Sequence, residues 1–212
     1  MKQLAHSYRI VEAYRHPEVI RLTLGYFFMV TSLYGFSFWL PTIIKKLSGS
    51  SNLVVTLISA LPYCVALLAI LSVGWSSDKT RERRWHTALP MIVAGIGLRL
   101  SVAAREQTAL AVAAFCLAAA GIYSFLPGFW ALSTSFLTGI AAAASIGLIN
   151  SIGNLGGFVG PYVVGYLSKR TNSFIAGVLY LSLSALLAAG FILSLRASAN
   201  KRSLAVNIPT KP

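Results

Sequence analysis

Residues 153–161 read Gly153-Asn154-Leu155-Gly156-Gly157-Phe158-Val159-Gly160-Pro161 and lie inside an apolar stretch from about 141 to 167. Glycine is costly inside a helix in water, whereas small residues are favoured in lipid where two helix backbones approach closely. Two GxxxG spacings occur, one from Gly153 to Gly157 and one from Gly156 to Gly160. The stretch therefore predicts a membrane helix that packs tightly through these four glycines and bends at Gly160-Pro161.

Composition indicates an integral membrane protein. Of the 212 residues, 56% are apolar and only 11% are charged, against about 25% charged in a soluble domain. Eighteen Lys and Arg against five Asp and Glu would favour nucleic-acid binding in a soluble chain. Here the charges flank apolar segments, as membrane topology requires, so no nucleic-acid partner is expected. Cys64 and Cys116 lie in apolar segments and are interpreted as small core residues, not as a disulfide or a metal site.

Six segments are long enough to cross a bilayer, which needs roughly 20 apolar residues each. They are expected near 20–44, 54–75, 87–104, 108–134, 138–167 and 174–195. The fold class predicted is thus an all-α membrane protein with six transmembrane helices in residues 20–195. Residues 1–19 are expected to form a cytoplasmic lead-in, and residues 196–212 a polar, disordered cytoplasmic tail.

The distribution of Lys and Arg predicts the orientation. Twelve fall on one side of the predicted membrane and five on the other. The richer side holds Lys2, Arg9, Arg15, Arg21, Lys79, Arg81, Arg83, Arg84, Arg196, Lys201, Arg202 and Lys211. The positive-inside rule then places both termini in the cytoplasm.

A charged loop follows the second segment and reads Gly74-Trp75-Ser76-Ser77-Asp78-Lys79-Thr80-Arg81-Glu82-Arg83-Arg84. An ordinary positive-inside turn would account for its charge. Its Gly74, Asp78, Lys79, Arg83 and Arg84 also resemble the signature loop of the major facilitator superfamily. Arg81 and Ser76 depart from that pattern, since Arg81 replaces the usual glycine and Ser76 an aliphatic residue.

Two further stretches resemble the anion:cation symporter family of that superfamily. Residues 34–44, with their lead-in at 14–19, are similar to its seventh helix, and residues 137–161 are similar to the end of its tenth helix and to its eleventh. The resemblance covers about residues 14–195. It implies a fold of twelve membrane helices in two six-helix halves, of which this chain matches only the second. The chain is therefore expected to be the carboxy-terminal half of a carrier, with a missing amino-terminal half as a partner, in the bacterial inner membrane.

Within the apolar segments no group is expected to carry a proton. All five acidic residues (Glu12, Glu18, Asp78, Glu82 and Glu106) and all three histidines (His6, His16 and His86) lie outside the predicted membrane core. An intramembrane enzyme would need a nucleophile with an embedded His or Asp partner, so no enzymatic activity, metal or cofactor is expected. Arg99, five residues before Ala104, is expected to snorkel to the interface.

Neutral polar and aromatic groups remain as candidate substrate contacts. The resemblance places Tyr34, Trp130, Asn150 and Asn154 at the central cavity. For Asn154, a hydrogen bond between helices is an equal alternative to substrate contact. An amide supplies two donors and an acceptor for hydroxyl and carboxylate groups, and an indole a donor beside a flat face. Tyr63 and Trp39 are expected to be interfacial or packing residues. The function expected is secondary transport of an organic anion, such as a sugar acid, a tartrate-like dicarboxylate or an aromatic acid, by proton symport. The alternative is a truncated remnant that does not transport.

Overall fold

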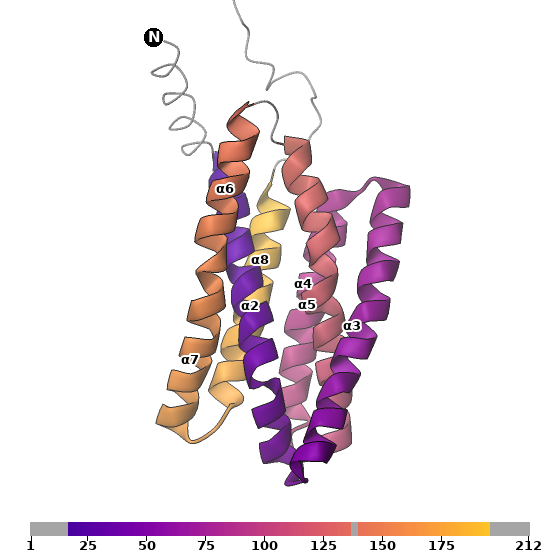
Figure 1. The fold of residues 1–212 in the computed structure, drawn as a ribbon, viewed down its shortest axis with the longest axis vertical. Helices are drawn as coiled ribbons and strands as arrows, with labels where there is room; N and C mark the ends of the chain where they lie inside the picture. Colours follow the sequence, from indigo (N-terminus) through magenta and orange to yellow (C-terminus); the bar gives the residue numbers. More distant parts are fainter. Residues whose placement is uncertain (1–16, 137–139, 196–212) are drawn as a thin grey trace, which may run out of the picture.

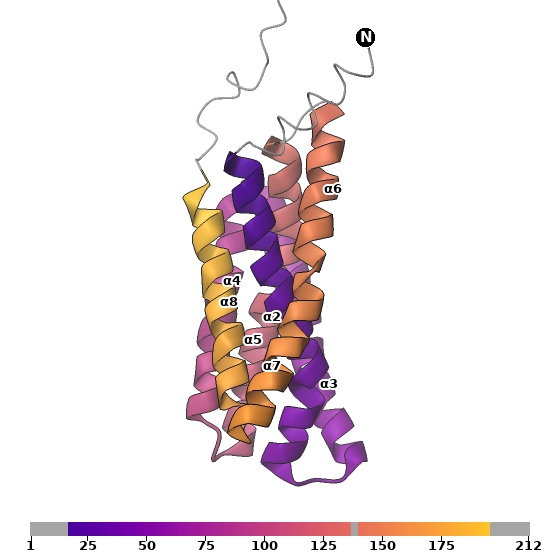
Figure 2. The ribbon, with the colours of Figure 1, turned by 90° about the vertical axis from the view of Figure 1, so that its left-hand side faces the viewer.

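The computed structural model describes residues 17–136 and 140–195, and all its regular elements within these ranges are helices. The helices run side by side as an elongated bundle (Figures 1 and 2). They are α2 (Pro17–Ser48), α3 (Asn52–Thr80), α4 (Arg83–Ala103), α5 (Thr108–Phe136), α6 (Ile140–Asn154), α7 (Gly156–Thr171) and α8 (Ile175–Ser194). The predictions for the lead-in at 1–16, the link at 137–139 and the tail from 196 lie outside the described residues.

Five helices, α2, α3, α4, α5 and α8, are long and apolar enough to cross a membrane. Predicted segment boundaries lie within about five residues of these helix ends, because apolar length dominates helix formation in lipid. The fifth predicted segment corresponds to two helices, α6 and α7, which follow each other along one edge of the bundle (Figure 1).

The break between α6 and α7 lies at Leu155, five residues before the Gly160-Pro161 pair at which a bend is predicted, and α7 continues through Pro161. The Asn154 side-chain amide donates to the Asn150 carbonyl oxygen at 2.8 Å, and such local bonds compete with the helical backbone pattern. The Leu155 N–H turns instead to the Ile152 carbonyl, 3.1 Å away. Because glycines follow this point, the chain loses little by leaving the helix there.

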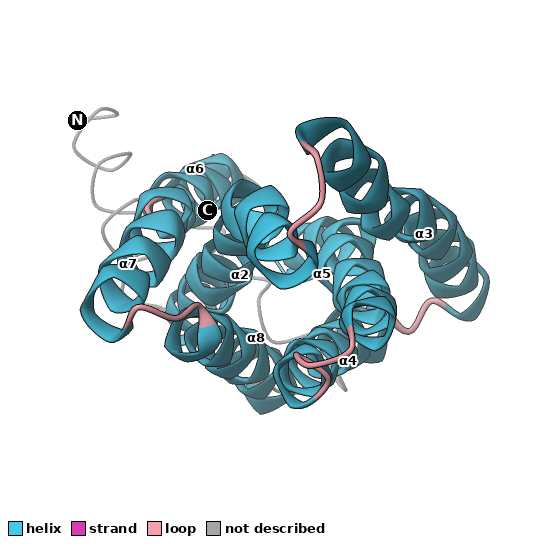
Figure 3. Cartoon of the chain, turned by 90° about the horizontal axis from the view of Figure 1, so that it is seen from below, coloured by secondary structure: helices cyan, strands magenta, loops and turns pink. Residues whose placement is uncertain are grey.

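The core lies between α2, α4, α5 and α8. Helix α8 is bonded to both neighbours: the Ser32 hydroxyl of α2 donates to the Leu181 carbonyl at 3.0 Å, and the Ser182 hydroxyl donates to the Gly95 carbonyl of α4 at 2.8 Å. Large side chains such as Phe36 fill the space between these helices. Seen along the bundle axis, α3 and α7 lie at opposite edges (Figure 3).

Neither cysteine is a core residue, so that interpretation is corrected. Cys64 is exposed on α3 and Cys116 is only half-buried on α5, and both are free thiols. Helix α3 is the least buried of the five long helices, with 22% of its most apolar window inside the bundle. An apolar position in such a helix often faces lipid rather than protein. A helix that is hydrophobic all round gives no sequence pattern that separates lipid-facing from protein-facing positions.

Candidate functional site

Three of the glycines on α6 and α7 lie directly against α2. A Cβ at Gly156 would overlap the Phe27 carbonyl oxygen, one at Gly160 would overlap the Thr31 carbonyl oxygen, and one at Gly153 would overlap the Tyr26 ring. Contact with backbone, as at Gly156 and Gly160, needs residues without side chains.

Gly157 is placed differently from the other three. It is half-buried, and a Cβ there would lie 3.3 Å from the Tyr34 ring, an exposed side chain with room to move. Gly157 lines an open groove between α2 and α7, together with Tyr34, Ser37, Phe158 and Pro161. The absence of a side chain at Gly157 therefore leaves space beside Tyr34 rather than serving helix contact.

Trp130 reaches the α6 region through one shared ring. The Tyr26 side chain of α2 packs edge-on against Trp130 of α5, with ring centroids 5.2 Å apart, and stacks on Phe129 at 4.8 Å. The same Tyr26 ring contacts Gly153. Tyr26 thus joins α5, α2 and α6 at one level of the bundle.

Asn150 and Asn154 are both exposed and are bonded to each other at the end of α6. The Asn154 amide nitrogen donates to the Asn150 side-chain oxygen at 2.8 Å as well as to its backbone oxygen. These bonds involve the two Asn150 oxygens and do not use its own two side-chain N–H donors. Such donors suit a carboxylate or hydroxyl oxygen.

A cluster of hydroxyl groups at the junction of α2, α3 and α5 was not among the predicted site residues. The Ser37 hydroxyl lies 2.8 Å from the Tyr123 hydroxyl, and the Tyr63 hydroxyl donates to the Ser37 carbonyl at 3.5 Å. Ser37 also lines the groove beside Tyr34. No sequence signal links Ser37 to Tyr123, because they lie on different helices and meet only through packing.

Trp39 is half-buried, and its indole N–H donates to the Pro161 carbonyl oxygen at 2.8 Å. Its ring also contacts Phe174, with centroids 5.4 Å apart. Trp39 is therefore a packing residue that also hydrogen-bonds α2 to α7.

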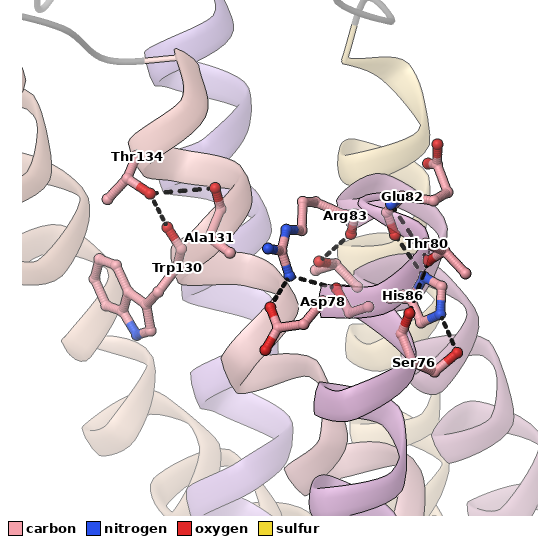
Figure 4. A network of polar contacts seen from close by, with 11 residues as sticks. Ser76, Asp78, Thr80, Glu82, Arg83, His86, Trp130, Ala131 and Thr134 are labelled. Carbon is pink, nitrogen blue, oxygen red and sulfur yellow. Dashed lines mark hydrogen bonds and ion pairs between the residues drawn. The ribbon is translucent and has the colours of Figure 1, made fainter.

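The charged loop between α3 and α4 forms a network of short contacts (Figure 4). Arg83 pairs with Asp78 at 2.5 Å and donates to the Ser77 hydroxyl at 3.1 Å. Glu82 caps α4 by accepting from the Trp85 N–H at 3.3 Å. Arg81 has a positive φ of 56° at the turn. In the view of Figure 4, the indole of Trp130 on α5 is turned away from the Arg83–Asp78 pair.

Two arginines at the end of the bundle that carries the α3–α4 loop form hydrogen bonds to the last turn of α8. Arg84 donates to the Leu193 carbonyl oxygen, and Arg21 donates to the Ser194 carbonyl oxygen at 3.2 Å. Cations are favoured at a helix carboxyl end, where backbone carbonyls lack partners. The remaining predicted loop residues have simpler roles: Lys79 lies over the Trp75 ring at 4.9 Å, and Gly74 contacts Pro127 of α5.

Acidic groups in the described part of the chain lie near helix ends or in connections. Glu18 is in the first turn of α2, Asp78 and Glu82 flank the α3–α4 turn, and Glu106 is in the α4–α5 connection. Arg99 is exposed near the end of α4. No group of three or more metal-ligating side chains occurs among the described residues.

Comparison with known proteins identifies the family. The model of the Major Facilitator Superfamily matches residues 2–161. The chain belongs to this superfamily. Members of the superfamily are non-enzymatic carriers, and the chain is accordingly a multi-pass membrane protein and not an enzyme.

Individual relatives within the superfamily agree. The chain is 39% identical over 176 residues to a putative tartrate transporter of Agrobacterium vitis, covering 83% of this chain and 40% of that protein. It is 37% identical over 177 residues to a quinolone resistance transporter of Acinetobacter baumannii, covering 82% and 40%. It is 34% identical over 189 residues to the inner membrane transport protein RhmT of Escherichia coli, covering 89% and 44%. The chain thus spans about two-fifths of the length of these curated relatives.

Proposed function

We propose that the chain forms six membrane spans, with α6 and α7 together making the fifth, and acts as the carboxy-terminal half of a secondary carrier for a small organic anion. The observation that carries this proposal is the face shared by α2, α5 and α6–α7. There Trp130 contacts the Tyr26 ring, which also lies against Gly153 of α6, and Tyr34 lines the α2–α7 groove. Asn150 and Asn154, hydrogen-bonded to each other on the exposed side of α6, are assigned to the same face by this proposal. The relative described as a putative tartrate transporter supports a carboxylate-bearing substrate.

In this proposal Asn150 donates to a substrate carboxylate or hydroxyl, Asn154 orients Asn150, and Tyr34 and Trp130 supply aromatic walls and polar hydrogens. The Ser37–Tyr123 hydroxyl pair lies beside Tyr34 and extends the polar face toward α3. Neutral groups bind without neutralising the anion, so a cationic anchor is assigned to an amino-terminal half that completes the cavity.

Proton coupling is likewise assigned to that other half. A proton-coupled carrier needs a titrating group within the membrane, and the acidic groups of the described residues lie near helix ends or in connections. We place the carrier in the bacterial inner membrane with both termini in the cytoplasm, because Lys and Arg concentrate on that side.

Uptake by membrane vesicles tests this function. The chain alone is compared with the chain joined to the amino-terminal half of a relative, using labelled tartrate with and without a protonophore. We expect concentrative, protonophore-sensitive uptake only from the joined protein. Concentrative uptake by the chain alone would contradict the half-carrier proposal and move the coupling group into these residues. Inactivity of the joined protein with tartrate and with sugar and aromatic acids would favour a non-transporting remnant.

Substitution of Asn150 tests the site in that joined protein. Asn150→Ala removes donors to a buried substrate oxygen, which is worth about 1–3 kcal/mol, so the apparent KM should rise about 5- to 150-fold. Asn154→Ala should raise it less, because Asn154 acts through Asn150. A larger effect of Asn154→Ala on KM at equal folded yield would reverse the two roles.

A further inference from the structure

A second groove, on the other side of the bundle, lies between α3 and α4 with α5 as its floor. These two helices are joined by a tight turn at Arg81 and Glu82, and both pack on α5 more extensively than on each other. The groove between them has a cavity volume of about 390 Å³. It is lined by Ala69 and Val73 of α3, Leu89 and Val93 of α4, and Ala120 and Ser124 of α5.

Small residues keep the floor of this groove low. A Cβ at Gly121 of α5 would overlap the Pro90 carbonyl oxygen of α4, so these helices touch backbone to backbone. Ala120 beside it contributes only a methyl group. Because α4 lies close to α5 while α3 lies apart from α4, the groove between α3 and α4 is open to the surroundings of the bundle. In a membrane those surroundings are acyl chains.

One end of the groove has the chemistry of a membrane interface. Trp75 on the α3 side and Trp85 on the α4 wall are 67% and 52% exposed, and exposed tryptophans gather at headgroup level. The Ser76 hydroxyl and the His86 ring, 3.0 Å apart, line the same end. Apart from the hydroxyls of Ser72 and Ser124, the other lining residues are apolar, as an acyl chain requires.

The charges at this end favour an anion. Lys79 lies over the Trp75 ring, and Arg81 is exposed and has no ion pair among the described residues. Of the two nearby carboxylates, Asp78 is paired with Arg83 and Glu82 caps α4. Two cations are thus available to a phosphate at headgroup level.

We propose that this groove binds one anionic glycerophospholipid, with an acyl chain between α3 and α4 and its phosphate beside Lys79 and Arg81. The lipid would fill the space that separates α3 from α4 and so support the α3–α4 turn. This inference uses the membrane location of the chain and is independent of what the carrier transports.

Native mass spectrometry of the purified 212-residue chain tests the proposal. The chain is offered phosphatidylglycerol or phosphatidylcholine with identical acyl chains. We expect one phosphatidylglycerol to be retained, with a preference over phosphatidylcholine of between about five- and thirtyfold, as one or two cations near an anionic surface provide. Equal retention of the two lipids would overturn the headgroup assignment.

Matched variants locate the lipid. The double variant Lys79→Gln, Arg81→Gln should abolish the preference, whereas Lys45→Gln, Lys46→Gln at the opposite end should keep it. Ala69→Leu and Ala120→Leu fill the groove from its wall and its floor, and both should lower retention of either lipid. Ala113→Leu, on an exposed position of α5 outside the groove, is their control.

Two results would refute the acyl-chain site. The first is unchanged retention in both Ala69→Leu and Ala120→Leu when thermal unfolding shows them folded. Ala69→Leu enlarges a side chain on the weakly packed α3 and therefore stays informative if Ala120→Leu does not fold. The second is a dimer mass in the wild type that Ala69→Leu removes, which would assign the groove to a second copy of the chain.

Discussion

At position 160, α2 leaves no room for a side chain on α7. The hydrogen of Gly160 faces the Thr31 carbonyl oxygen, and its Cβ position lies 3.2 Å from the Gly35 backbone nitrogen. Two helix backbones thus meet where each carries a glycine. In lipid this backbone contact is stabilised mainly by van der Waals packing, because no hydrophobic effect drives membrane helices together, so its strength depends on the fit of a few atoms.

Gly160→Ala should destabilise the chain, and Gly157→Ala should not. The added methyl at Gly160 overlaps backbone, and overpacking costs about 1–3 kcal/mol, partly offset by up to about 1 kcal/mol of helix propensity. At Gly157 the methyl meets the mobile Tyr34 ring, so the propensity gain dominates. Thermal unfolding in detergent measures both variants. Equal stabilities would show that the α2–α7 contact tolerates a side chain.

Only part of the candidate site could be predicted from the sequence. The placement of Tyr34, Asn150 and Asn154 at a central cavity came from a resemblance and stays a prediction; in the structure Tyr34 lines the α2–α7 groove, and the two asparagines are hydrogen-bonded to each other. The role of Gly157 could not be separated from that of Gly156 or Gly160, because two GxxxG patterns overlap and the break at Leu155 changes the helix phase between them. The Ser37–Tyr123 contact joins residues 86 positions apart, and no periodicity reports such a pair.

At the scale of elements, α8 connects α2 to α4 through two serines. Ser32 and Ser182 donate across helix boundaries, whereas the Ser184 hydroxyl, equally buried, donates to Tyr180 of its own helix at 3.0 Å. The existence and length of these helices followed from apolar segments. Which helices pack against each other could not be predicted from the sequence, because a helix such as α8 is apolar all round and shows no preferred face.

Ser182→Ala should cost more stability than Ser184→Ala. Hydrogen bonds between membrane helices average about 0.6 kcal/mol, with a maximum of about 1.7 kcal/mol, and Ser182→Ala also leaves the Gly95 carbonyl without this donor. Ser184→Ala loses only a bond to a carbonyl of its own helix and should change stability little. Unfolding of both variants in detergent by a chemical denaturant makes the comparison. A larger loss for Ser184→Ala would contradict the assigned role of α8.

For the whole molecule, the described residues alone do not bias the orientation. Arg21 and the four cations of the α3–α4 turn lie at one end, and Lys45, Lys46, Arg105, Lys169 and Arg170 lie at the other. The excess of twelve over five arises from cations in residues 1–16 and 196–212. Orientation by the positive-inside rule therefore depends on those flanking segments, because the two ends of the bundle carry equal numbers of Lys and Arg.

Cysteine labelling in intact cells tests that orientation. In a background with Cys64→Ser and Cys116→Ser, a cysteine is placed at Thr80, beside the α3–α4 turn, or at Asn172, between α7 and α8; both positions are exposed. An impermeant maleimide should label Asn172→Cys in intact cells and Thr80→Cys only after permeabilisation. Replacing Lys201, Arg202 and Lys211 with Gln should increase the fraction of molecules in which Thr80→Cys is labelled from outside, because it removes part of the bias. Labelling of Thr80→Cys but not of Asn172→Cys in intact cells, with the wild-type charges kept, would show the reverse topology. Complete labelling of each variant in intact cells would mean that an even number of spans separates the two positions, as when α6 and α7 together do not cross the membrane.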